Sequence, residues 1–357
     1  MNRSRCISIV YTLVAAASLL APCASCLAQL VNDASPRAVA INTAWWQRNV
    51  ASGKEFRLPI GTLYINGTAS TPAAVGVGPI KTKGAFVYPI GPHEKSVAGN
   101  FTRIVQLGKG PVLRDCGTGM QCNDPLWLVG DGESAAIEVE GRTYPSTGRS
   151  KYSNICFQGW GCAFKALGGY YQDGKFVADE NHADNVTATN CHTFQMRKFF
   201  RSENVQALNW NFIECGMWDL CEQGQELDCI FADIDRGGDV VIDRLVGSAL
   251  KLTVFRVNWY SPNTNLLVCR DYRGDRRPVP GYRLTPLEYA ETPGRVSPTT
   301  GKPVPGADWQ TPACDYNFTF TGKVATHQAD CEITYKVPDN FPRKRWKIDL
   351  EKSEAAK

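Results

Sequence analysis

The sequence lacks the short motifs that mark several common enzyme classes. It contains no phosphate-binding loop, no Gly-x-Ser-x-Gly nucleophile elbow and no His-Glu-x-x-His motif. Only 4 histidines occur in 357 residues, they are scattered, and no Cys-x-x-Cys pair follows residue 28. These absences argue against a P-loop nucleotidase, an α/β-hydrolase and a Cys/His zinc site.

An excess of charge of one sign is also missing. The chain has 39 Lys and Arg against 35 Asp and Glu, and two of the basic residues, Arg3 and Arg5, lie in an N-terminal leader. The remaining near-balance gives no general attraction to nucleic acid or to a membrane surface. The one basic cluster, Arg343 to Lys347, is interpreted as a solvated tail near the C-terminus.

Residues 1–28 have the layout of a signal peptide. A basic start precedes an apolar stretch from Ile7 to Leu20, and small residues up to Ala28 supply a cleavage point. The apolar stretch is too short for a confident membrane span. Cysteines follow it as in a lipoprotein, but Pro22 directly before Cys23 fits that class poorly. We therefore expect export, to a periplasmic or extracellular location, with no membrane attachment after cleavage.

The cysteine content agrees with export. Of the 14 cysteines, three lie in the leader, so an odd number remains to pair in an oxidising compartment and at least one stays free. Close spacing predicts two local disulfides, each closing a short loop, and a third disulfide would join the two strands of a C-terminal hairpin. The predicted pairs are Cys116–Cys122, Cys156–Cys162 and Cys314–Cys331.

Two similar segments nineteen positions apart, 185–191 and 204–210, indicate a repeat. Each is a short alternating stretch that begins at Asn-Val and ends in an asparagine followed by a large or soft apolar residue. A strand-like repeat of about twenty residues is typical of a solenoid whose coils stack strand upon strand. Stretches that begin at Asn154 and Asp228 extend the alignment, which places Val186 and Val205 in one inward-facing column.

The N-terminal third carries a resemblance to a known family. An amphipathic helix is predicted over Pro36 to Val50, and Leu58-Pro-Ile-Gly-Thr-Leu-Tyr-Ile65 and Thr102-Arg-Ile-Val105 follow it. This order resembles the opening of the pectate-lyase-superfamily β-helix proteins, and the likeness extends over roughly residues 36 to 260. The resemblance implies a right-handed parallel β-helix with a capping helix. It implies little about activity, since the superfamily contains lyases, hydrolases, esterases, epimerases and non-catalytic adhesins.

The predicted architecture is therefore all-β. We expect a single-stranded right-handed parallel β-helix with its N-terminal cap over residues 29–272. Prolines punctuate the chain after Tyr260, so residues 273–313 are predicted to form an irregular arm. A hairpin between Cys314 and Cys331, turning at Thr321 to Lys323, would cap the last coil, and a basic tail would end the chain at 357.

A column of Asn190, Asn209 and Asp233 is the first polar feature of the predicted coils. It would grip a sugar or a cation if it faced solvent. The favoured interpretation is an asparagine ladder, because stacked amides satisfy one another in tight turns and tolerate a left-handed backbone.

The catalytic candidates lie near this column. In the predicted register His192 and Asp235 share one face about 10 Å apart, two coils removed from each other. Asp233 would supply a second carboxylate, and Arg236 would match the arginine base that the family resemblance implies for a lyase. A surface histidine and solvated turn carboxylates are the alternative interpretation.

Substrate-binding candidates come from the same coils. Trp218 and Trp259 suit sugar stacking, whereas Trp160 and Trp210 fall in a column that is interpreted as core. Arg244 is a candidate for a sugar carboxylate, and Glu214 belongs to an acidic concentration over residues 179–243. Those acidic side chains would also suit Ca²⁺, although no cofactor is required.

Two functions remain open at this stage. The first is a secreted polysaccharide lyase or glycoside hydrolase that acts as a monomer on an acidic or plant- or algal-type polysaccharide. The second is a non-catalytic glycan-binding or structural β-helix module. The Asn-x-Asp, Asp-Asp, Gly-His-Gly and Arg-x-Lys set of polygalacturonase-like proteins is missing, which favours the second. The number of enzymes in the superfamily favours the first.

Overall fold

The structure is a computed structural model. The residues that it describes are 31–52, 54–67, 75–76, 80–83, 102–115, 119–141, 150–178, 183–204, 207–218, 227–235, 237, 239–247, 249–257, 266–274, 282–289, 317–325, 332–337 and 343–353. The expected signal peptide lies outside them. None of the described residues forms a helix with the length and apolar character that a membrane span requires.

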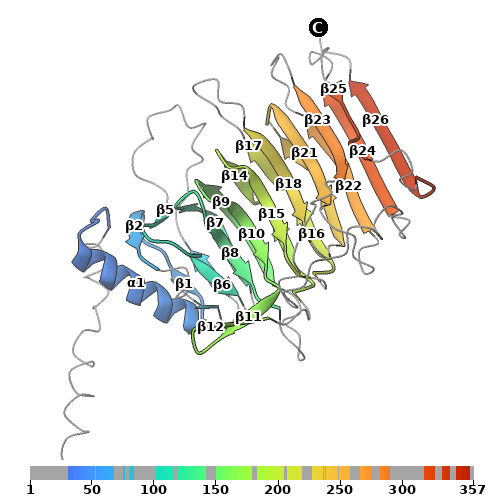
Figure 1. Ribbon diagram of the computed structural model, residues 1–357. Coiled ribbons are helices and arrows are strands. Elements are labelled where there is room, and N and C mark those ends of the chain that lie inside the picture. The colour runs from blue at the N-terminus through green and yellow to red at the C-terminus, as the bar shows by residue number, and fades with distance from the viewer. Residues whose placement is uncertain are drawn as a thin grey trace, which may run out of the picture.

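Parallel strands in two long sheets make up the fold (Figure 1). The fifteen-stranded sheet is bent into two arms, because the long strands β7, β9 and β22 pair with different neighbours along their two halves. The first arm contains β1 (Phe56–Arg57), β4 (Ile80–Lys83), β7 (Gly119–Val129), β9 (Lys151–Gln158), β13 (Thr187–Thr189), β16 (Trp210–Ile213), β19 (Val240–Asp243), β22 (Leu266–Gly274), β24 (Asn317–Ala325) and β26 (Trp346–Ser353). The second arm adds β2 (Gly61–Ile65), β5 (Thr102–Gln106), β14 (His192–Phe194), β17 (Gly216–Trp218) and β20 (Val246–Gly247).

The nine-stranded sheet forms the third side of the coil. Its members are β3 (Val75–Gly76), β6 (Leu113–Asp115), β8 (Ala135–Val139), β10 (Cys162–Ala166), β15 (Lys198–Ser202), β18 (Asp228–Ile234), β21 (Lys251–Val257), β23 (Arg283–Tyr289) and β25 (Glu332–Ile333). A hairpin of β11 (Gly169–Gln172) and β12 (Lys175–Ala178) is inserted after β10. The all-β prediction is confirmed, and three stacked sides of parallel strands fit a parallel β-helix.

The helix α1 (Pro36–Ala51) lies against the first coils at the N-terminal end (Figure 1), in agreement with the prediction. It begins there because the Ser35 hydroxyl accepts a hydrogen bond from the Ala38 amide, with proline at the first helical position. Trp46 is fully buried and donates its indole N–H to the Val112 carbonyl at 3.0 Å. This contact ties the helix to the third side of the coil.

The length of one coil differs from the predicted repeat. Thr187 pairs with Asn211, and the Asn209 side chain donates to Asn185 at 3.2 Å, a separation of 24 residues. Asn204 is instead a corner of the same coil as Asn185, and its amide donates to the Leu167 carbonyl. The nineteen-residue register was wrong because one coil has several similar corners.

The asparagine ladder exists, but with different members. Asn190 donates to Asn154 of the preceding coil at 2.7 Å, while Asn209 stacks on Asn185 at another corner. Asp233 belongs to neither ladder, since it lies in the nine-stranded sheet. The corner between the two arms is one left-handed residue in each of five successive coils, namely Asn154, Asn190, Glu214, Arg244 and Asp271.

Apolar side chains fill the interior of the coils. Trp160 and Trp210 are both buried, as predicted. Phe164, Phe199 and Phe212 contact one another as a cluster of tilted and edge-on rings, with centroids between 5.4 and 6.3 Å apart. Stacking of like residues in adjacent strands about 4.8 Å apart gives this core its continuity.

The C-terminal part corrects two predictions. The strand β23 lies within the predicted irregular arm and pairs with β21 even though it contains Pro286. The segment from Asn317 to Ala325 is one continuous strand that pairs in parallel with β22 and β26, so the described residues contain no turn at Thr321 to Lys323 and no antiparallel hairpin there. Gly322 looked like a turn residue, but it is needed because a Cβ there would lie 2.3 Å from the Tyr272 carbonyl oxygen.

The predicted disulfide between Cys156 and Cys162 is also wrong. Both thiols are free, because the chain turns a corner between them: Cys156 pairs with His192 on the second arm, and Cys162 lies on the nine-stranded sheet. No disulfide joins two cysteines of the described part of the chain. Cys116, Cys314 and Cys331 lie outside that part, so the other two predicted pairs stay predictions.

Candidate functional site

The structure separates the predicted site residues into two groups. Asp233 and Asp235 lie at the end of β18 in the nine-stranded sheet. His192, Trp218, Glu214 and Arg244 lie on the second arm or at the corner beside it. The predicted register required His192 and Asp235 to share one face, and the structure places them on different sides of the coil. Arg236 and Trp259 lie outside the described residues.

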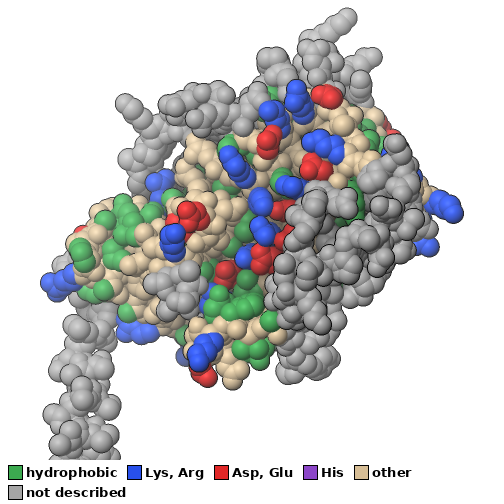
Figure 2. Space-filling view, in the orientation of Figure 1, with side chains coloured by type: hydrophobic (Ala, Val, Ile, Leu, Met, Phe, Trp, Pro, Cys, Tyr) green, Lys and Arg blue, Asp and Glu red, His purple; other side chains and the backbone are tan. Residues whose placement is uncertain are grey.

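A line of charged side chains, here called the charged row, crosses the outer face of the nine-stranded sheet. Its members occupy the same register position on successive strands, so neighbours lie about 4.8 Å apart. Figure 2 shows blue and red side chains gathered in a band over this face. The row consists of Arg114, Glu138, Lys165, Arg201, Asp233, Arg256, Glu288 and Lys336.

The signs alternate along the charged row with one exception. Arg114 contacts Glu138 at 2.8 Å, and Glu288 receives both Arg256 at 3.5 Å and Lys336 at 3.4 Å. Lys165 and Arg201, however, are direct neighbours of like charge. Two cations therefore adjoin within the row at its centre, and the carboxylate of Glu203, just after β15, contacts both of them, at 3.0 and 2.9 Å.

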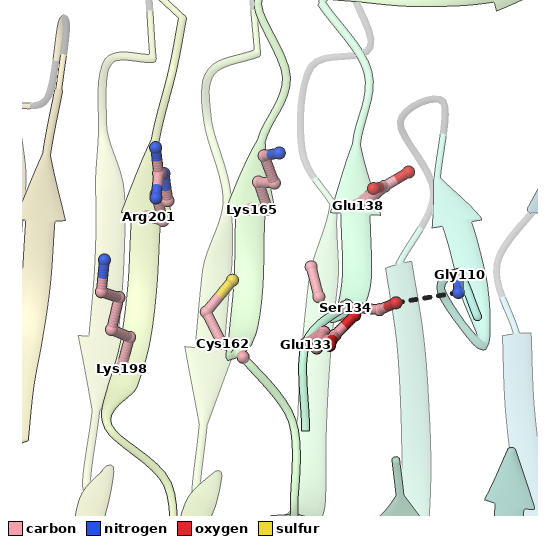
Figure 3. Close-up of a pocket in the computed structure, with 10 residues that line it drawn as sticks. Gly110, Glu133, Ser134, Glu138, Cys162, Lys165, Lys198 and Arg201 are labelled. Carbon is pink, nitrogen blue, oxygen red and sulfur yellow. Dashed lines mark hydrogen bonds between the residues drawn. The ribbon is translucent and has the colours of Figure 1, made fainter. Parts of the chain in front are cut away.

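A pocket of about 310 Å³ opens at this break in the alternation. Lys165, Lys198 and Arg201 line it together with Cys162 and Ser134. In Figure 3, Lys165 and Arg201 stand side by side on neighbouring strands, and Lys198 lies on the strand of Arg201, three residues before it. A second pocket of about 360 Å³ continues along the same face near Arg256 and Glu288. The face is thus hollowed along the solenoid axis.

Two cations of the first pocket, Lys165 and Arg201, are held in their charged form. Burial alone would lower the pKa of Lys165, but the carboxylates of Glu203 and Glu138, with Cys162, together raise that pKa. Burial also opposes the charge of Arg201, yet Glu203, Asp235 and Asp233 together raise its pKa. Side chains with raised pKa values are anion binders and poor general bases.

The predicted catalytic carboxylates are already engaged. Asp233 is 2% exposed and contacts Lys198 at 2.5 Å, and Asp235 is 8% exposed and contacts Arg201 at 3.0 Å. A general acid needs a carboxyl group that a substrate can reach, and both of these carboxylates are nearly buried against their cations. The arrangement favours a structural and binding role for both residues.

The inserted hairpin gives the charged row an aromatic edge. The Tyr171 ring lies 3.5 Å from the Arg114 guanidinium, and the Tyr171 amide donates to Glu140 at 3.0 Å. Phe176 packs against Tyr171 and remains 49% exposed. Sequence reasoning missed these aromatic residues and the three pocket cations. Only the correct coil register would have aligned them.

His192 belongs to a hydrogen-bond chain and not to an acid–base pair. Trp218 donates to His192 Nδ1 at 3.3 Å, and His192 Nε2 lies 2.8 Å from Asn190 Oδ1. Asn190 then donates to Asn154, whose amide donates to the Cys122 carbonyl. An acceptor role at Nδ1 requires the neutral tautomer with its proton on Nε2. Burial lowers the pKa of His192 to about 4, consistent with that neutral form.

This histidine makes stability depend on pH. Its folded-state pKa of about 4 lies below the ordinary value of 6.5, so between these values the unfolded chain binds more protons. The free energy of unfolding is therefore expected to fall by up to about 3 kcal/mol as the pH drops through this window. Urea unfolding at about pH 7 and about pH 4.5 measures it. The His192→Gln variant should lose part of this dependence, and equal pH slopes in the two proteins would contradict the assignment.

Glu214 and Arg244 form an ion pair at the left-handed corner. Both are more than 40% exposed, and the pair lies on a different side of the coil from the charged row. They are therefore placed as corner residues beside the His192 chain. In the described part of the chain, no group of three or more His, Cys, Asp or Glu side chains is arranged to hold a metal ion.

Neither the family models nor the curated proteins nor the solved structures yield a match to this chain.

Proposed function

We propose that this chain is an exported, right-handed parallel β-helix protein of the pectate-lyase-superfamily type that binds an acidic polysaccharide along the charged row. The observation that carries the proposal is the pocket at the break in alternation, where Lys165, Lys198 and Arg201 meet. An external carboxylate or sulfate would share these cations with Glu203, Asp233 and Asp235, which already contact them.

The dimensions of the face support a polymeric ligand. The eight positions of the charged row extend over about 34 Å at the spacing of parallel strands. The two pockets lie along the same line, and the exposed Phe176 of the hairpin offers an apolar ring near one end. A small molecule would fill one pocket, whereas a polysaccharide would contact several charged positions at once.

Binding is favoured over catalysis by the ionisation of the site. The raised pKa values of Lys165 and Arg201 suit ligand recognition, and a lyase base would need the opposite shift. A second candidate is hydrolysis or β-elimination at the same face. It is favoured by one observation, the presence of Asp233 and Asp235 together beside the pocket cations.

The test compares binding of polygalacturonate, alginate and neutral dextran to the wild type and two variants. Lys165→Gln removes a pocket cation, and Arg270→Gln removes an exposed arginine from the fifteen-stranded sheet as a matched control. Lys165→Gln is expected to weaken binding of the acidic polymers roughly tenfold, because one charge-assisted contact is lost. Arg270→Gln should leave it unchanged, and added salt should weaken wild-type binding.

Equal affinity for dextran, or equal losses in both variants, would contradict the proposal. The same incubations should be read for unsaturated products and for new reducing ends. Product release by the wild type that disappears in Asp233→Asn would establish the catalytic alternative in place of simple binding.

A further inference from the structure

We propose that Cys191 and Cys215 form a disulfide that joins two adjacent coils inside the core when the chain folds under oxidising conditions. Both cysteines are fully buried and both are free thiols in this structure. The proposal concerns residues that the predicted disulfides did not include, and it is independent of the proposed glycan binding.

The register brings the two cysteines together. They directly precede the paired residues His192 and Gly216, and the Gly216 amide donates to the Cys191 carbonyl at 3.1 Å. Equivalent residues of adjacent parallel strands lie about 4.8 Å apart, within the Cα separation of 4.4–6.8 Å that disulfides adopt. No backbone movement is needed to bring the two Cα atoms within range.

The Cys215 thiol faces the coil of Cys191, while the Cys191 thiol donates to the Thr189 carbonyl of its own coil at 3.5 Å. The Cys215 thiol donates to the Ala188 carbonyl at 3.4 Å, and Ala188 belongs to the coil of Cys191. The next positions of this column are Ile155 and Leu245, which are both apolar and buried. Burial raises the pKa of Cys191 well above its ordinary value, and contact with the Cys215 thiol adds to the effect.

The chemistry requires a disulfide oxidant, such as glutathione disulfide. The thiolate of one cysteine attacks a sulfur of the oxidant and expels one glutathione thiolate, leaving a mixed disulfide. The second cysteine then attacks the protein sulfur of that bond and expels the second glutathione. Two electrons and two protons pass from the cysteine pair to the oxidant, which becomes two thiols.

The timing follows from burial. In the folded protein both sulfurs are inaccessible and Cys191 is held as the thiol, so exchange with a soluble oxidant is blocked. The reaction must occur during folding, before the coils close over the pair. The cross-link would then be fixed in a position that external reductants do not reach.

The test is peptide mapping of the full-length chain. Protein is refolded from denaturant with either a glutathione redox mixture or dithiothreitol, alkylated under denaturing conditions and digested. We expect a peptide linking Cys191 to Cys215, two hydrogen atoms lighter than the separate peptides, only after oxidative refolding. Cys269, whose stacked neighbours are Ile242 and Phe320, should be alkylated in both samples.

Reduced, already folded protein that is given glutathione disulfide should not form the link, and its formation there would overturn the proposed order of events. Alkylation of both cysteines after oxidative refolding, or a link from either one to Cys156, would overturn the pair itself. In Cys215→Ala, refolded in the same way, Cys191 should be recovered alkylated.

Discussion

Replacing Trp210 with alanine is expected to lower the free energy of unfolding by about 3–5 kcal/mol. The indole is fully buried and stacks on Phe200 with ring centroids 4.3 Å apart. It also donates its N–H to the Ala183 carbonyl at 2.7 Å, an acceptor that the substitution leaves without this donor. The large cavity crosses two coils, so neighbouring rings cannot collapse into it without breaking register. Chemical denaturation measures the loss.

The matched control is Phe176→Ala in the inserted hairpin. That ring is about half exposed and touches Tyr171 outside the core, so its removal should cost less than about 1 kcal/mol. Similar losses in the two variants would show that Trp210 does not carry the interior packing described above. The intermediate variant Trp210→Phe should keep the ring contact and lose only the hydrogen bond.

Replacing Glu138 with alanine is expected to cost about 3–5 kcal/mol, because it leaves a buried cation without its partner. The Arg114 side chain is 2% exposed, and two of its nitrogens donate to one oxygen of Glu138 at 3.0 and 2.8 Å. Tyr171 covers the guanidinium on its other side. Water therefore cannot replace the lost carboxylate without moving the hairpin.

Glu133→Ala is the corresponding control, since Glu133 and its partner Lys109 are both mostly exposed. Its loss should change stability by less than about 1 kcal/mol. The double variant Arg114→Met/Glu138→Leu should recover much of the loss, because replacing both members of a buried pair by apolar residues is often near neutral. If the double variant recovers no stability, the loss in Glu138→Ala comes from missing side-chain volume and not from the unpaired charge of Arg114.

The scaffold could be predicted from the sequence because local residue patterns determine its helix, strands and corners. Ser35 and Pro36 mark a helix start, period-two alternation marks strands, and Trp160 and Trp210 stand at inward positions. The asparagine ladder was predictable in type for the same reason. Left-handed backbone and stacked amides are local requirements of a tight corner.

The candidate site was not predictable in the same way because it depends on coil register. Insertions such as the hairpin after β10 change the separation of stacked positions, so no constant repeat aligns Lys165 with Arg201. The sequence alignment treated Asn204 as equivalent to Asn185. This wrong register placed His192 and Asp235 on one face that they do not share. The prolines of residues 273–313 predicted an irregular arm, but Pro286 is accommodated within the paired strand β23.

The single left-handed residue at the corner between the two arms determines, in every coil from β9 to β22, which side chains of the next strand point inward. The segments between strands at the other corners differ in length from coil to coil, and one of them contains the hairpin of β11 and β12. An added residue at Asn190 or Glu214 would instead advance the following strand by one position and exchange its inner and outer side chains. A change of length at this corner would therefore place apolar side chains of the next strand in solvent and polar ones in the core. The other corners do not impose this limit on length.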